Sequence, residues 1–235
     1  MTICNTTNRP STLRNLPVPK ATATALAVAF AAALAQPALA ARINVPDVPD
    51  NLKITDGSHV FLKGSAVGTQ NYICVPSGTS ATGVAYALFT PQATLFGGDD
   101  LQVTTHFFSP NPDEANASPK VVANGTIRAT WQSSRDSSRI WAKVRPADPT
   151  IPGDIGDAST DQRFVAQGAV AWLKLTAVGR EEGPDGGDTL SKSTFVQRLN
   201  TQGGLAPTTG CSAPADLGNQ AFVPYTADYF FYTDQ

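Results

Sequence analysis

Short segments in which apolar and polar residues alternate recur along most of this chain. In residues 138–144, for example, Ile140, Ala142 and Val144 fall on one side and Trp141 falls on the other. A period of two is the pattern of a half-buried β-strand. We therefore expect a strand here and further strands at residues 59–64, 69–75, 84–90, 101–108, 125–132, 169–178, 193–200 and 221–232.

The strand expected at residues 193–200 has two chemically different faces. Phe195, Gln197 and Leu199 share one side. Val196 and Arg198 share the other side with a threonine. One face is therefore apolar apart from an amide, and the opposite face carries a guanidinium group.

The turn residues favour an all-β fold. The chain contains 19 Gly and 18 Pro, and these residues separate the expected strands. No segment after residue 40 keeps apolar residues at helical spacing over three turns, so helices should be few and short. We predict an antiparallel β-sandwich or barrel with long polar loops at residues 109–124, 146–162 and 179–188.

The first forty residues have the layout of a secretory signal peptide. Arg9, Arg14 and Lys20 form a basic start, and an apolar run follows at residues 21–35. This run is shorter than the roughly 20 residues that a membrane-spanning helix needs. Small residues around Ala40 predict cleavage after that position. We expect a single exported domain of residues 41–235, without a membrane span, in the periplasm or the extracellular space.

Two Asn-x-Ser/Thr triplets begin at Asn116 and Asn124. They would carry glycans only if a eukaryotic secretory pathway handled the chain. The alanine-rich leader is more typical of a bacterial protein, so we assign no role to these triplets.

The charge balance argues against binding to nucleic acid. The chain has 17 Lys and Arg residues and 19 Asp and Glu residues. Loss of the leader removes three basic residues and no acidic ones, which leaves 14 basic groups and a net charge of −5. A nucleic-acid binder needs a basic surface that neutralises phosphates, and the sequence contains no run of Lys or Arg.

Cys74 and Cys211 are the two cysteines that remain after loss of the leader. In an oxidising compartment, an even pair of cysteines favours a disulfide. Free thiols or a pair of metal ligands are the alternatives, although neither cysteine has a second Cys or a His at ligand spacing. The sequence thus predicts a disulfide that closes a very long loop.

Histidine is rare in this chain, and both copies, His59 and His106, lie in expected strands. His106 belongs to a Thr-Thr-His-Phe-Phe segment, where a polar group beside aromatic rings could line a pocket. The alternative is a buried histidine that is hydrogen-bonded to a backbone carbonyl. Two isolated histidines with scattered carboxylates match no metal-ligand spacing, so we expect no metal site.

The chain contains no recognisable catalytic or cofactor-binding motif. It lacks the Gly-x-Ser-x-Gly elbow of hydrolases and the Gly-rich fingerprints of nucleotide-binding folds, so no cofactor is expected. Asp136 and Asp228 lie near aromatic residues, but we interpret the first as part of a hairpin turn and the second as a hydrogen-bonded strand residue. The acidic loop at residues 184–188 lacks the order of a calcium-binding loop, and a hairpin turn is the simpler interpretation.

Several longer motifs are spread over nearly all of the chain after the leader. They are Phe61-Leu-Lys-Gly-Ser-Ala-Val-Gly-Thr-Gln-Asn-Tyr-Ile-Cys74, Thr105-His-Phe107, Thr130-Trp131 with Asp136-Ser137, Ala171-Trp-Leu173, Val196-Gln-Arg-Leu-Asn-Thr-Gln-Gly-Gly204, Gly210-Cys211 and Val223-Pro-Tyr-Thr-Ala-Asp-Tyr-Phe-Phe-Tyr232. In combination these motifs resemble the DUF3455 family. The resemblance implies an exported protein from a largely uncharacterised family of bacteria, fungi and some plants.

The resemblance supplies no catalytic residues, because the family has none established. Some fungal members carry a malate dehydrogenase label, which the absence of a nucleotide fingerprint here does not support. Residues 108–129 and 146–162 depart from the family pattern by their length. The rim of any pocket beside His106 should therefore differ in this protein.

These observations favour a non-enzymatic, exported β-domain that binds a small molecule or a glycan. The residues expected to contact that ligand combine stacking faces with amide and guanidinium donors: Gln70, His106, Trp131, Gln197, Arg198 and Tyr225. Alternatively, Gln70, Gln197 and Asn200 satisfy backbone groups, and Arg198 pairs with Asp228. Two further functions remain open: a hydrolase or lyase that uses His106 with an Asp, and a structural or stress-related role in the cell envelope.

Overall fold

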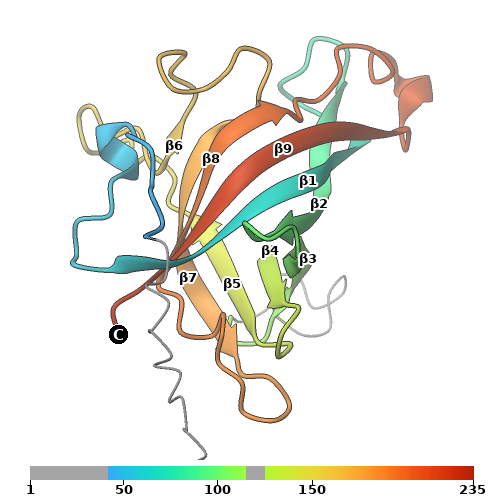
Figure 1. The fold of residues 1–235 in the computed structure, drawn as a ribbon. Helices are drawn as coiled ribbons and strands as arrows, with labels where there is room; N and C mark the ends of the chain where they lie inside the picture. Colours follow the sequence, from blue (N-terminus) through green and yellow to red (C-terminus); the bar gives the residue numbers. More distant parts are fainter. Residues whose placement is uncertain (1–41, 115–124) are drawn as a thin grey trace, which may run out of the picture. The chain divides into compact units, whose positions relative to one another are not determined.

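The computed structural model describes residues 42–114 and 125–235 (Figure 1). Within these segments the chain forms a closed antiparallel barrel of eight strands, with one additional short strand and two short 3-10 helices. The elements are η1 (Asp50–Leu52), β1 (His59–Pro76), β2 (Val84–Phe96), β3 (Gln102–Asn111), β4 (Thr126–Ser133), β5 (Arg139–Val144), β6 (Ala158–Ser159), β7 (Trp172–Glu181), β8 (Phe195–Gly203), η2 (Pro214–Asp216) and β9 (Gln220–Thr233). The expected signal peptide, residues 1–40, and the triplet at Asn116 lie outside the described residues. The triplet at Asn124 begins outside them and ends within them.

The barrel closes by two pairings between strands that are not consecutive in the chain. β1 to β5 follow one another in order around the sheet, as do β7 to β9. β9 then pairs with β1, and β5 pairs with β7, while β6 adds a short edge beside β7. The prediction of an all-β antiparallel fold is confirmed. Of the two architectures predicted, sandwich and barrel, the structure is a barrel.

The expected strands are confirmed with two corrections, one of which is the short strand β6 within the loop expected at residues 146–162. The segments predicted at residues 59–64 and 69–75 belong to a single long strand, β1. The small residues between them hide its continuity, since they interrupt the alternation. At Gly68 a Cβ atom would lie 2.0 Å from the carbonyl oxygen of Gln92 in β2. Only glycine permits this approach of the two backbones.

One face of every barrel strand points to the interior. Ile140, Ala142 and Val144 pack in this inner layer, as their alternation predicts, whereas Trp141 on the outer face donates a hydrogen bond from Nε1 to Ser109 Oγ at 2.8 Å. Large side chains fill much of the interior: Leu95, Trp131, Leu175, Leu190, Val196, Tyr225, Tyr229 and Phe231. Burial of their apolar surface is the main stabilising contribution to the barrel.

A second apolar cluster lies on the outer side of β8 and β9. Phe230 and Tyr232 belong to it, while Tyr229 and Phe231, which alternate with them along β9, belong to the inner cluster. The segment around η1 packs against this outer cluster through Leu52, which is fully buried. The part of this outer face around Phe230 and Tyr232 is therefore covered by the chain that precedes the barrel.

Cys74 and Cys211 form a disulfide, as the sequence predicts. Cys74 lies near the end of β1, and Cys211 lies in the connection between β8 and β9. The same connection is held a second time, because the Tyr72 hydroxyl donates to the carbonyl oxygen of Gly204 at 2.6 Å. Together the two links fix this connection against the end of the barrel.

The β4–β5 turn confirms the structural interpretation of Asp136. Its carboxylate accepts hydrogen bonds from the Ser138 hydroxyl at 2.7 Å and from the backbone N–H of Thr189 at 2.9 Å. Burial alone would raise the pKa of Asp136, but these hydrogen bonds outweigh burial and hold the pKa well below its usual range. The acidic loop is also a turn, closed by a bond from Gly183 N–H to the carbonyl oxygen of Gly187.

None of the helices in the described segments is long and apolar enough to cross a membrane. The two 3-10 helices each contain three residues.

Candidate functional site

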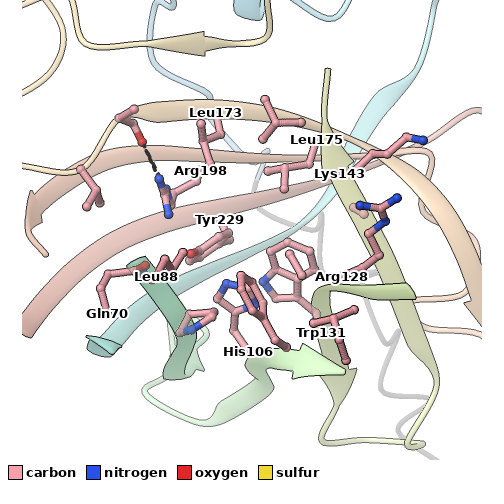
Figure 2. Close-up of a pocket in the computed structure, with 18 of the residues that line it drawn as sticks. Gln70, Leu88, His106, Arg128, Trp131, Lys143, Leu173, Leu175, Arg198 and Tyr229 are labelled. Carbon is pink, nitrogen blue, oxygen red and sulfur yellow. Dashed lines mark hydrogen bonds between the residues drawn. The ribbon is translucent and has the colours of Figure 1, made fainter. Parts of the chain in front are cut away.

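The barrel interior contains a cavity of about 560 Å³ (Figure 2). Each of the eight barrel strands contributes at least one lining residue, and the rest come from the connections that precede β7 and follow β8. The lining is mainly aliphatic and aromatic, with few polar side chains. Eight-stranded barrels are just wide enough to be filled by side chains or to hold one small molecule.

Aromatic rings form one wall of this cavity. His106 of β3 and Trp131 of β4 are directly opposite each other in the two strands, and their rings stack at 4.3 Å with an angle of 4°. Tyr229 of β9 lies across both rings, with centroid distances of 5.2 Å to His106 and 5.6 Å to Trp131. The stack presents flat aromatic surface and a small number of polar atoms.

His106 is held as a neutral ring. Burial lowers its pKa to about 3, although a hydrogen bond to the carbonyl oxygen of Thr130 acts in the opposite direction. The Nδ1 atom lies 2.9 Å from that carbonyl oxygen, which can only accept, so Nδ1 carries the proton. This contact confirms the expectation of a histidine bonded to a backbone carbonyl. Nε2 is left as an acceptor, and it has no hydrogen-bond partner among the described residues.

Two buried donors in the lining have no hydrogen-bond partner within the described structure. They are Trp131 Nε1 and the amide nitrogen of Gln70. Gln70 is 1% exposed. A buried donor without a partner costs about 1 to 3 kcal/mol. Such atoms are therefore positions where a bound molecule or water would be stabilised.

Arg198 brings a positive charge into the cavity from β8. Its Nη2 and Nε atoms donate to the carbonyl oxygen of Ala171 at 2.9 and 3.2 Å (Figure 2). No Asp or Glu lies within ion-pair distance of this guanidinium in the described residues. The prediction that Arg198 pairs with Asp228 is wrong, because β8 and β9 place the two side chains on opposite faces of the sheet.

Asp228 instead belongs to a polar group on the outer surface. It accepts hydrogen bonds from Ser65 Oγ at 2.8 Å and Asn200 Nδ2 at 2.9 Å, and it pairs with Lys63 at 3.0 Å. The expected role as a hydrogen-bonded strand carboxylate is therefore confirmed. Asn200 has a φ of 52° at the β8 bulge and binds this carboxylate rather than a backbone group.

Four of the six residues proposed from the sequence line the cavity: Gln70, His106, Trp131 and Arg198. Tyr225 does not line the cavity but contacts a residue that does: its hydroxyl lies 3.2 Å from that of Tyr229. Gln197 does not face the cavity. Its amide donates to the carbonyl oxygen of Leu52 at 2.6 Å and its oxygen accepts from Tyr232, so it serves the outer cluster, as the structural alternative predicts.

The sequence did not single out Tyr72, Phe108 and Tyr229, which also line the cavity. Alternation along β9 does contain the signal for Tyr229, because it places Tyr225, Ala227 and Tyr229 on one side. No comparable signal exists for the connections around Ala171 and Leu205.

The described residues contain no group of three or more His, Cys, Asp or Glu side chains that could hold a metal ion. The cavity lining likewise includes no Asp or Glu. All Asp and Glu residues of the chain belong to the described segments, so the absence of an acidic lining residue holds for every Asp and Glu of the chain.

The fold and cavity define a closed antiparallel β-barrel domain with an accessible interior. The chain belongs to the family described as protein of unknown function (DUF3455), whose model matches residues 55–233. This confirms the resemblance seen in the sequence motifs, and the matched range includes all nine strands and every residue that lines the cavity. No curated protein and no solved structure matches the chain.

The low pKa of His106 predicts a pH-dependent stability. Between pH 6.5 and 3 the unfolded chain binds a proton at this position that the folded barrel does not, so stability falls as the pH falls. We expect the advantage of the wild type over His106→Phe in free energy of unfolding to shrink by about 2 kcal/mol from pH 7 to pH 5. Urea denaturation at both pH values measures this, with His59→Phe as the control. An advantage that is the same at both pH values would contradict the neutral, buried ring.

Proposed function

We propose that the barrel binds a small molecule in its interior cavity, outside the cytoplasm. The main support for this proposal is the cavity of about 560 Å³, which is lined by residues of all eight barrel strands and is mainly apolar with a few polar side chains. Small-molecule sites have volumes of roughly 300 to 1,000 Å³ and this same mixture of surfaces. Two of the polar atoms, Trp131 Nε1 and the Gln70 amide nitrogen, are buried donors without partners.

The lining favours a mainly apolar molecule over a glycan. Side chains such as Phe108, Leu173 and Leu175 offer no hydrogen bonds to the hydroxyl groups of a sugar. Burying such hydroxyls without partners is costly, whereas an apolar body gains from contact with these side chains. An aromatic or aliphatic compound with one polar end therefore fits the cavity best.

A thermal-shift screen of residues 41–235 tests this proposal directly. A ligand that binds only the folded state raises the melting temperature in proportion to its concentration relative to Kd. We expect hits among apolar small organic acids and phenolic compounds, and none among oligosaccharides or metal ions. A panel without a single reproducible hit would instead favour a structural or protein-partner role.

An enzymatic function that uses His106 with an Asp receives little support. No carboxylate lines the cavity, so no Asp is placed to orient or to share a proton with this ring. A general base works best when its pKa is near the operating pH, and the pKa of His106 is about 3. Binding without turnover is therefore the function proposed, and recovery of each hit unchanged after incubation with the protein is the result expected.

Export is part of the proposal. A disulfide is compatible with an oxidising compartment, and the amino-terminal sequence has the layout of a signal peptide. Mass spectrometry of the protein expressed in a bacterial host should find a periplasmic or secreted product that begins at Ala41. A product that begins at Met1 and remains in the cytoplasm would contradict export.

A further inference from the structure

The cavity combines an unpaired cation with an excess of hydrogen-bond donors. Arg198 lines the cavity, donates to the carbonyl oxygen of Ala171 and has no ion-pair partner among the described residues. The other two cations of the lining, Arg128 and Lys143, lie on the opposite side in Figure 2, and both are within ion-pair distance of Glu114. Arg198 is thus the lining cation without an ion-pair partner in the described residues.

The groups around Arg198 include several hydrogen-bond donors, so they are suited to bind a ligand group that accepts hydrogen bonds. Tyr229 points toward the same region in Figure 2, and its hydroxyl contacts that of Tyr225 at 3.2 Å. Arg198 of β8 and Tyr229 of β9 are directly opposite each other, and the guanidinium lowers the pKa of Tyr229 against the larger effect of burial. Gln70 adds an amide nitrogen without a partner. A carboxylate contains only acceptor oxygens and would satisfy several of these donors at once.

We propose that the ligand is an organic monoanion with an apolar body, and that Arg198 binds its carboxylate. This inference rests on the proposed function. The planar donors of one guanidinium without an ion-pair partner match the two oxygens of one carboxylate. The His106–Trp131 stack and the aliphatic wall around Leu175 accommodate the body.

The entrance to the cavity is consistent with such a ligand. Leu88, Ile127 and Leu205 line the cavity and yet are 43%, 41% and 48% exposed, respectively. Large apolar side chains that are both exposed and part of a cavity lining are a feature of sites that take apolar molecules. An amphipathic acid can therefore contact apolar surface at the opening before its carboxylate reaches Arg198.

The test compares three acids with their neutral amides of nearly the same shape: phenylacetate and phenylacetamide, 1-naphthylacetate and 1-naphthylacetamide, octanoate and octanamide. Affinities are measured by calorimetry at pH 7.5 for the wild type and for Arg198→Gln. Arg163→Gln is the matched control, because it removes the same charge from an exposed residue that pairs with Asp161. Arg198→Lys keeps the charge and loses the planar pair of donors.

We expect the acids that fit to bind the wild type at least about tenfold more tightly than their amides, the range of a charge-assisted hydrogen bond. Arg198→Gln should remove this preference, Arg198→Lys should keep part of it, and Arg163→Gln should leave it unchanged. Amides that bind the wild type as well as the acids would overturn the inference while leaving the binding function intact. If no compound of any pair binds the wild type, both the inference and the proposed function fail.

Discussion

Replacing both cysteines of the disulfide with alanine is expected to lower the free energy of unfolding by about 4 to 5 kcal/mol. Cys74 and Cys211 are 137 residues apart, so the link closes a very long loop in the unfolded chain. Its loss increases the conformational freedom of the unfolded state far more than that of the barrel. Such a change is a large part of the stability of a domain this size.

Urea denaturation of residues 41–235 at pH 7 measures this effect. The wild type treated with a reductant should match the Cys74→Ala/Cys211→Ala variant, and the reductant should leave the variant unchanged. Intact mass after alkylation without reductant should show no labelled cysteine in the wild type. Two labelled thiols, or equal stability of variant and oxidised wild type, would contradict a stabilising disulfide.

The same variant should also bind ligands more weakly. The connection that contains Cys211 begins next to Gly204, which accepts the hydrogen bond from Tyr72, and its Leu205 lines the cavity. Without the disulfide this connection loses its covalent link to β1 and keeps hydrogen bonds, among them that from Tyr72 to Gly204 and the two backbone bonds of Cys74 to Gly218 and Asn219. Leu205 at the edge of the cavity should then be held less firmly.

Filling the cavity with Ala129→Phe is expected to reduce ligand affinity at least a hundredfold. Ala129 lies on the inner face of β4, opposite Phe108 of β3 and Ala142 of β5, and all three line the cavity. A benzyl group at this position would occupy the space assigned to the apolar body of the ligand. The barrel should stay folded, because the ring fills an apolar space rather than a packed one.

Ala87→Phe is the matched control for this change. Ala87 is an exposed residue of β2 that does not line the cavity, so the same ring is added outside it. Affinity is measured with the compound that gives the largest shift in the thermal screen. Retention of wild-type affinity by Ala129→Phe would show that binding occurs elsewhere, provided that its melting temperature is close to that of the wild type.

The strands of this barrel could be predicted because each carries a local alternation of apolar and polar residues. Residues 138–144 are an example, since Ile140, Ala142 and Val144 all face the interior. The closing pairs, β1 with β9 and β5 with β7, could not be predicted, because they join strands that are distant in the chain. The sequence therefore left the choice between a sandwich and a barrel open.

The candidate site was predicted in part for a related reason. His106 and Trp131 stand out as chemically distinctive residues in expected strands, and the β3–β4 register stacks them. Gln197 and Arg198 are consecutive in β8 and point to opposite faces, so only one of them can line the cavity. The alternation at residues 193–200 already placed the two on different faces, but it did not show which of the faces lines a cavity.

The central claim, that the interior binds a small molecule, is tested most directly by the three indole N–H signals in a ¹H–¹⁵N NMR spectrum. Trp131 lines the cavity with an unpartnered Nε1, Trp141 donates to Ser109 on the outer face, and Trp172 belongs to the outer cluster. Trp131→Phe assigns the cavity signal by its disappearance. Titration with the six matched acids and amides should shift the Trp131 signal and leave the other two nearly unchanged. No shift with any compound, or shifts confined to Trp141 or Trp172, would contradict binding inside the barrel.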